Sequence, residues 1–180
     1  MFDITAAHWH LIFNHLPVVG ILAAVLLLVW GLIRNNAELK RTALLTFVLV
    51  GILAYISNAT GGGAASAIRD IPGVNRQDIR SHSSAADLAT TVSFALAGIA
   101  FIGLIVAWRK KDESGVDNSI SNYVRHHKEP HKLFVIACLL GGLLDIYMLA
   151  KTAELGGAIR HPEIRSGYQV PAAQVDTSKK

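Results

Sequence analysis

Four long apolar stretches, separated by polar segments, dominate the hydrophobicity pattern of the chain. They cover about residues 11–33, 43–59, 88–108 and 133–150. A helix rises 1.5 Å per residue, so stretches of this length match the ~30 Å hydrocarbon core of a bilayer. The pattern predicts an all-α integral membrane protein, a four-helix up-down-up-down bundle with both termini on one side. We expect residues 1–180 to form a single membrane domain, with 166–180 as a flexible tail.

The composition agrees with a membrane protein and excludes several other classes. Hydrophobic residues make up 52% of the 180 residues and charged residues only 17%, whereas soluble domains carry about 25% charged residues. The net charge of +4 does not indicate nucleic-acid binding, because the basic residues gather at the ends of the apolar stretches. Cys138 is the only cysteine, which excludes an intramolecular disulfide and a covalently attached c-type haem.

The distribution of lysine and arginine predicts an orientation. The segments that join spans one and two and spans three and four hold slightly more of these residues than the opposite side. Such basic segments favour the cytoplasm. We therefore expect a multi-pass protein of the bacterial inner (cytoplasmic) membrane, with both termini in the periplasm.

Eight histidines are many for a membrane protein of this size. Three of them lie in the basic segment between spans three and four, where a solvated loop accounts for them: His126, His127 and His131. The other five all fall on the predicted periplasmic side: His8, His10, His15, His82 and His161. This gathering makes the five residues candidate metal ligands.

The most telling of the five is His15, which lies inside the first span. An imidazole without a partner is costly there, so we expect His15 to face the bundle. Spans one and three run parallel, which allows His15 to approach His82. Two neutral imidazoles on facing helices are what a b-type haem requires, with cations for its propionates. The sequence thus predicts haem b bound by His15 and His82, with His10 and His161 as a second pair, His8 as a further ligand candidate, and arginines beside the propionates: Arg69, Arg80 and Arg160.

Other interpretations of these histidines stay open. A histidine near a helix end is often an interfacial residue that bonds to a carbonyl or to water, and Ser83 or Ser84 beside His82 is suited to cap the third helix. The same cluster can hold copper or zinc in a non-haem accessory subunit. A structural subunit of a larger membrane complex is the third alternative.

Asp145 lies near the middle of the fourth span, where a charged carboxylate costs ~2.5–3.5 kcal/mol. One interpretation is proton transfer beside a bound quinol, which would make Asp145 part of a cofactor site. The other is helix packing through a hydrogen bond to one nearby polar side chain, with these candidates: Ser57, Asn58, Thr90, Thr91 and Ser93. Gly61–Gly63 and Gly156–Gly157 predict that the second and fourth helices end in turns there.

Two motifs resemble those of a family of small bacterial four-helix integral membrane proteins. They are His10-x-x-x-Asn14-His15-x-Pro17 and the Gly-Gly-x-Ile-Arg-His-x-Glu-Ile motif of residues 156–164. The resemblance covers all four spans and implies binding of b-type haem. The family's Thr-Gly-Glu-x-Ala-Glu and His-Glu motifs read here as residues 60–65 and 82–83, without the carboxylates. That loss favours haem or copper over a harder metal.

These observations predict an electron-transfer protein. The expected function is a membrane b-type cytochrome or cytochrome-like subunit of an oxidoreductase complex. It would pass electrons between the quinone pool and a periplasmic redox partner.

Overall fold

The computed structural model describes residues 5–109 and 130–164, and these residues are helical apart from short connections. Four helical stretches are long and apolar enough to cross a membrane, as the hydrophobicity pattern predicts. The elements are α1 (Ala6–Phe13), α2 (Leu16–Ile33), α3 (Ala37–Ile68), α4 (Arg76–Arg109), α5 (Lys132–Arg160) and the short 3-10 helix η3 (Pro162–Ile164).

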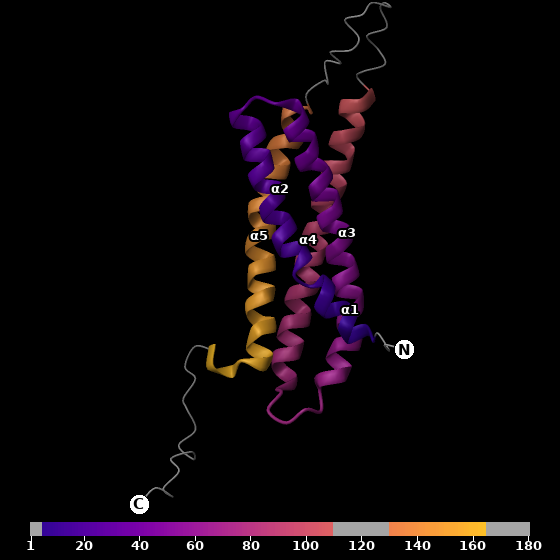
Figure 1. Ribbon diagram of the computed structural model, residues 1–180, viewed down its shortest axis with the longest axis vertical. Helices are drawn as coiled ribbons and strands as arrows, with labels where there is room; N and C mark the ends of the chain where they lie inside the picture. The colour runs from indigo at the N-terminus through magenta and orange to yellow at the C-terminus, as the bar shows by residue number, and fades with distance from the viewer. Residues whose placement is uncertain (1–4, 110–129, 165–180) are drawn as a thin grey trace, which may run out of the picture.

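Helices α2 to α5 stand side by side along the long axis of the molecule (Figure 1). Helix α2 packs against α3 and α5, and α4 packs against the same two helices, whereas the described parts of α2 and α4 are not neighbours. The connection between α2 and α3 lies at one end of the bundle. The connection between α3 and α4 lies at the other end, together with the start of α1 and the end of α5.

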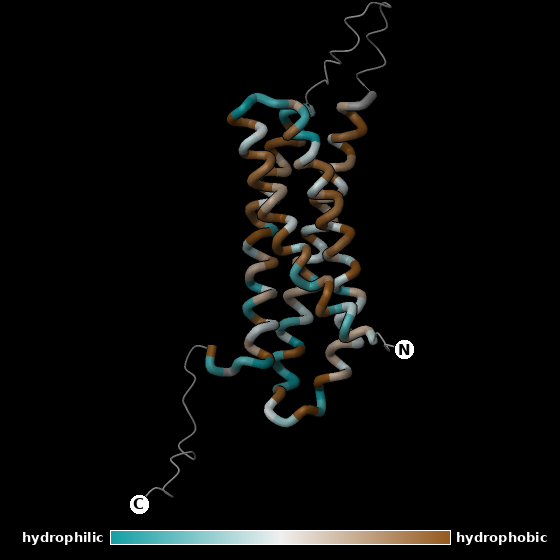
Figure 2. Tube along the Cα trace, viewed as in Figure 1, coloured by the Kyte–Doolittle hydropathy of each residue, from teal (hydrophilic) through white to brown (hydrophobic). Residues whose placement is uncertain are grey.

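The middle of the bundle is apolar both inside and outside. The interior is filled by side chains such as Phe47 and Leu28, which are almost fully buried. Large apolar side chains also cover the exterior, where Leu26 is 68% exposed and Leu140 is 63% exposed. Polar residues concentrate at the two ends (Figure 2). A long bundle with an apolar exterior belt matches the surface that a bilayer covers.

The first predicted span is two helices in the structure, because the chain breaks between Phe13 and Leu16. Pro17 follows in the first turn of α2. Proline has no backbone N–H and clashes with the preceding turn, so a continuous helix is disfavoured here. The break turns α1 away from the line of α2 and lays it on α3 (Figure 1). The span predicted over 11–33 is thus present as part of the candidate membrane span Ala6–Ile33, with a break at residues 14–15 that the hydrophobicity pattern does not predict.

The glycine segments do not end helices, contrary to expectation. Gly61–Gly63 lie inside α3 and Gly156–Gly157 inside α5. Two of them, Gly63 and Gly156, instead permit close approach: a Cβ on Gly63 would lie 2.4 Å from the Cβ of Ala6 in α1, and one on Gly156 would lie 2.9 Å from Cε1 of His82. The turn between α3 and α4 is made at Gly73, which has a φ of 85°.

The predicted orientation and the predicted flexible tail depend in part on two segments that lie outside the described residues. They are the basic segment with His126 and His127, and residues 166–180.

Candidate functional site

His10 reaches across from α1 to α3, because the break before α2 lays α1 on that helix. Its Nδ1 lies 2.9 Å from the carbonyl oxygen of Ser57 and 3.4 Å from Oγ1 of Thr60. The ring rests over Gly61, where an added Cβ would lie 3.6 Å from Cε1 of His10. His10 is thus half-buried and held by one turn of α3.

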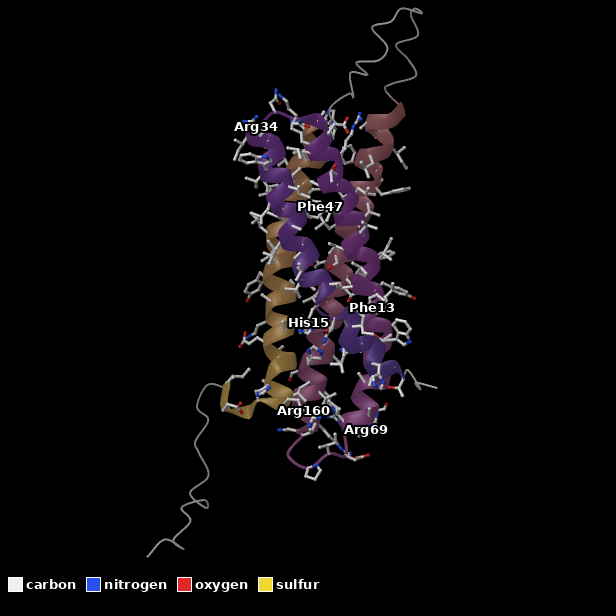
Figure 3. All side chains as sticks on the ribbon, viewed as in Figure 1. Phe13, His15, Arg34, Phe47, Arg69 and Arg160 are labelled. Atoms are coloured by element: carbon white, nitrogen blue, oxygen red, sulfur yellow. The ribbon has the colours of Figure 1, made fainter. Side chains whose placement is uncertain are left out.

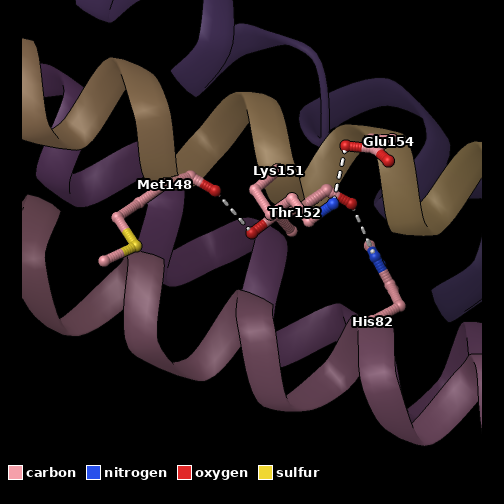
Figure 4. A network of polar contacts seen from close by, with 5 residues as sticks. All are labelled: His82, Met148, Lys151, Thr152 and Glu154. Carbon is pink, nitrogen blue, oxygen red and sulfur yellow. Dashed lines mark hydrogen bonds and ion pairs between the residues drawn. The ribbon is translucent and has the colours of Figure 1, made fainter.

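His82 is held in the same manner by α5. It lies well inside α4, which begins at Arg76, so Ser83 and Ser84 do not cap this helix. Its Nδ1 lies 3.0 Å from the carbonyl oxygen of Thr152 (Figure 4). A Cβ on Gly156 would lie 2.9 Å from Cε1 of His82, which is closer than real contacts allow. The ring therefore occupies the space that a side chain at position 156 would need.

The surroundings of the Thr152 carbonyl are polar but neutral overall. The hydroxyl of Thr152 donates to the carbonyl oxygen of Met148 at 2.9 Å, and Lys151 pairs with Glu154 at 2.9 Å (Figure 4). Both members of the ion pair are largely exposed. Neither contact uses the carbonyl oxygen of Thr152, which accepts from His82.

The two histidines thus occupy equivalent seats. In each, Nδ1 bonds to a helix carbonyl, at Ser57 or Thr152, and the ring lies over the glycine one turn later. A carbonyl oxygen only accepts, so Nδ1 carries the proton in both rings. In the neutral imidazole, Nε2 is then the unprotonated nitrogen. Among residues 5–109 and 130–164, neither Nε2 has a hydrogen-bond partner, which leaves it free to bind a metal.

The two imidazoles lie on helices that are not neighbours but at a similar level of the bundle. Asn58, next to Ser57 on α3, donates to Asp87 of α4 at 3.0 Å, five positions after His82, so the two rings belong to the same region of the bundle. The described residues of α1 make no contact with α4. The rings therefore extend toward one region from two separated helices.

His15 does not face the bundle, contrary to expectation. It lies at the break between α1 and α2, its ring is exposed, and its Nδ1 bonds to the side chain of Asn14 (Figure 3). The reason is the break itself, which changes the direction in which residues of the first span point. The structure pairs His82 with His10 in place of His15.

His8 and His161 have local partners at chain turns. Nδ1 of His8 accepts from the backbone N–H of Thr5 at 3.2 Å at the start of α1, so its protonation is the reverse of that of His10. His161 follows the end of α5 and lies 2.9 Å from Oε1 of Glu163. Both histidines are exposed, and each contributes to the cap of a helix end.

The glutamate beside His161 is held in its charged form. Its own backbone N–H, and secondly the His161 ring, lower the pKa of Glu163 below the usual value of a glutamate. The side chain is exposed, so this contact organises the turn at η3 and involves no buried site.

Arg69 and Arg160 follow the two glycines that contact the histidine rings, nearer the ends of α3 and α5. Along α3, position 69 follows Gly61 by two turns, and along α5, position 160 follows Gly156 by one turn, so Arg160 shares the helix face of its seat. Both lie at the same end of the bundle (Figure 3). Arg80 is different, because it lies two positions before His82 on the opposite side of α4. It lines a hollow with Arg69 and Arg76.

Asp145 is fully buried and has one hydroxyl partner. Oγ of Ser93 in α4 lies 2.9 Å from Oδ1 and 3.0 Å from Oδ2 of Asp145. Of the two interpretations of Asp145, the packing bond is present in the structure, and its partner among the five candidates is Ser93. Position 145 precedes Thr152 by two turns, about 10 Å along α5, so the carboxylate lies further into the bundle than the histidine seats.

The donor set of the described residues is small. Residues 5–109 and 130–164 contain no group of three or more His, Cys, Asp or Glu side chains suited to hold a metal ion.

The contacts of His10 with Ser57 and of His82 with Thr152 were not predicted, because each joins two helices that are far apart in the sequence. The signal that was available is a glycine four positions after Ser57 and after Thr152.

Comparison with known proteins does not assign the chain to a family. No family model matches the chain, and neither a curated protein nor a solved structure matches it.

Proposed function

We propose that this protein is a membrane b-type cytochrome or cytochrome-like subunit in which His10 and His82 are the axial ligands of haem b. The bundle would cross the bacterial inner membrane with up-down-up-down topology. It would pass electrons between the quinone pool and a periplasmic partner.

The observation that carries the proposal is the pair of equivalent histidine seats. Haem iron needs only two protein ligands, one on each face of the ring. His10 and His82 come from different helices, lie at a similar level of the bundle and each leave Nε2 free. The predicted first pair used His15, which is exposed and bonded to Asn14; His10 takes its place in the proposal.

The protein's own groups would orient and tune these ligands. A ligating histidine usually donates its other ring N–H to a carbonyl or carboxylate, which fixes the ring and raises its basicity. The carbonyls of Ser57 and Thr152 supply that acceptor. Arg160, which lies one turn beyond Gly156 on α5, is suited to neutralise a propionate. When bound, a haem supplies a centre that takes up and releases one electron.

The donor set supports haem over a zinc site. Structural zinc takes four protein ligands and catalytic zinc three, whereas the described residues offer no group of three. The copper or zinc accessory subunit and the purely structural subunit are the outcomes against which the proposal is tested.

The place of the seats supports exchange with an extramembrane partner. His82 lies six positions from the start of α4 and Thr152 eight positions from the end of α5. The histidines are thus near one end of the spans, the end predicted to face the periplasm. Asp145, further into the bundle, acts in this proposal as a packing residue and transfers no proton.

A visible spectrum of the purified protein tests the proposal. After haem-replete expression we expect a Soret band and α-bands of a low-spin haem. His10→Ala and His82→Ala should each abolish the low-spin spectrum while the protein stays in the membrane fraction. His15→Ala should keep the spectrum, since that ring is exposed.

The matched control is His131→Asn at the opposite end of the bundle. There the side chain accepts from the N–H of Leu133 at the start of α5, and asparagine can replace it in that role. Unchanged low-spin spectra in both His10→Ala and His82→Ala would refute the ligand pair. Absence of haem from the wild type, with bound copper or zinc, would favour the accessory subunit.

A further inference from the structure

A hollow with three arginines lies where α3 meets α4, at the end of the bundle that holds the histidine seats. Its volume is about 250 Å³ and its walls are Ala65, Arg69, Arg76, Ile79 and Arg80. Positions 76, 79 and 80 share one face of α4, and 65 and 69 share one face of α3. The two helices therefore direct their arginines to a common opening.

The positive charge of this hollow is only partly neutralised. Arg76 pairs with Asp70 at 3.1 Å in an exposed ion pair. The guanidinium of Arg69 donates to the neutral hydroxyl of Ser66 at 3.1 Å. Arg80 pairs with no carboxylate among the described residues. Asp78, on the same helix, does not line the hollow. Two guanidinium groups thus face the opening without a described counter-charge.

The three arginines lie directly at the ends of two apolar helices. Arg69 follows the last residue of α3, and Arg76 is the first residue of α4. In a membrane this is the level of the phospholipid headgroups. Guanidinium groups bind phosphate oxygens through paired, charge-assisted hydrogen bonds, and the apolar walls Ala65 and Ile79 suit the start of an acyl chain.

We propose that this hollow binds the phosphate of an anionic phospholipid. The inference rests on the membrane placement of the proposed function but not on haem. Arg80 and His82 lie on opposite sides of α4, so a lipid in the hollow and a ligand on His82 would occupy separate places.

Native mass spectrometry of delipidated protein in detergent tests the proposal. With phosphatidylglycerol added, we expect the wild type to retain this lipid in preference to zwitterionic phosphatidylcholine. Arg80→Gln should weaken phosphatidylglycerol binding about fivefold, the effect of one interfacial arginine. Arg76→Gln should weaken it less, because Asp70 already compensates that charge.

Arg34→Gln is the matched control. Arg34 lies at the opposite end of the bundle, at the end of α2, with its guanidinium 5.8 Å from the centre of the Trp30 ring. We expect this variant to bind phosphatidylglycerol as the wild type does. Arg80→Gln should also keep the haem content of the wild type.

Three results would overturn the proposal. Equal retention of the two lipids, with displacement by millimolar inorganic phosphate, would identify free phosphate as the ligand. Equal phosphatidylglycerol binding by wild type and Arg80→Gln would exclude the hollow. Joint loss of lipid and haem in Arg80→Gln would assign the hollow to propionates. Release of the protein from membranes by alkaline washing would refute the membrane placement instead.

Discussion

His82 lies in the space that a side chain on residue 156 would fill, with its Cε1 2.9 Å from the position of a Cβ on Gly156. The same ring bonds to the Thr152 carbonyl one turn earlier on α5. The glycine and the hydrogen bond together determine where the imidazole lies between α4 and α5.

Gly156→Ala should displace His82 from its seat. Alanine is a better helix former than glycine by about 0.5–1 kcal/mol, so a loss of function would come from the collision with the ring and not from the helix. We expect haem content, measured as Soret absorbance per protein, to fall at least about tenfold, as for loss of a ligand-orienting bond.

Gly62→Ala is the control for this variant, since a Cβ there meets nothing within 4 Å. It should keep the haem content of the wild type. A Gly156→Ala protein with full haem content would show that the seat over Gly156 is not needed for binding.

Ser93→Ala should destabilise the bundle. Asp145 is fully buried, and the Ser93 hydroxyl bonds to both of its carboxylate oxygens. Loss of a partner from a buried polar group costs about 1–3 kcal/mol. Thermal unfolding in detergent should show the loss, with the visible spectrum unchanged.

Thr91→Ala serves for comparison, because its hydroxyl bonds to the carbonyl oxygen of Asp87 within α4 and is exposed. Its unfolding temperature should stay close to that of the wild type. An effect of Ser93→Ala on electron transfer without an effect on stability would argue for the proton-transfer interpretation of Asp145.

The titration of Glu163 should report its two partners separately. Its pKa is lowered first by its own backbone N–H and then by His161, so NMR should show a midpoint below that of an ordinary glutamate. His161→Ala should raise the midpoint only in part, because the backbone contact remains.

The direction of the pH effect follows from the lowered pKa. The contact favours the charged carboxylate, so its contribution to the η3 turn is present above the pKa of the unfolded chain and is lost as pH falls through the lowered value. A midpoint in His161→Ala equal to that of the wild type would exclude the imidazole as a partner.

Reporter fusions test the orientation. We expect tags at residues 1 and 180 to report the periplasm and a tag near Gly115 to report the cytoplasm, because basic segments next to spans stay in the cytoplasm. The opposite pattern would place the histidine seats at the cytoplasmic end. The bundle and the ligand pair would remain unaffected by that result.

The helices that depend on local hydrophobicity could be predicted from the amino-acid sequence alone. Runs of apolar residues locate α2 to α5, because the length of such a run is the property that makes a helix suited to a bilayer. The partner of Asp145 could be narrowed to five candidates, since a buried carboxylate needs a donor and few polar side chains exist at that depth. The structure shows that the partner is Ser93. The helix ends were less well predicted, because Gly61–Gly63 and Gly156–Gly157 resemble turn signals yet lie inside helices.

The partner of each histidine depends on how the helices pack. The spacing of His15 along one straight helix placed its ring toward the bundle, but the break before α2 turned that ring outward and carried His10 onto α3. A small change in helix direction at Pro17 alters the position of every residue before it. Contacts such as His10 to Ser57 join distant parts of the chain, and their geometry depends on how two helices pack, which no local pattern in the sequence contains.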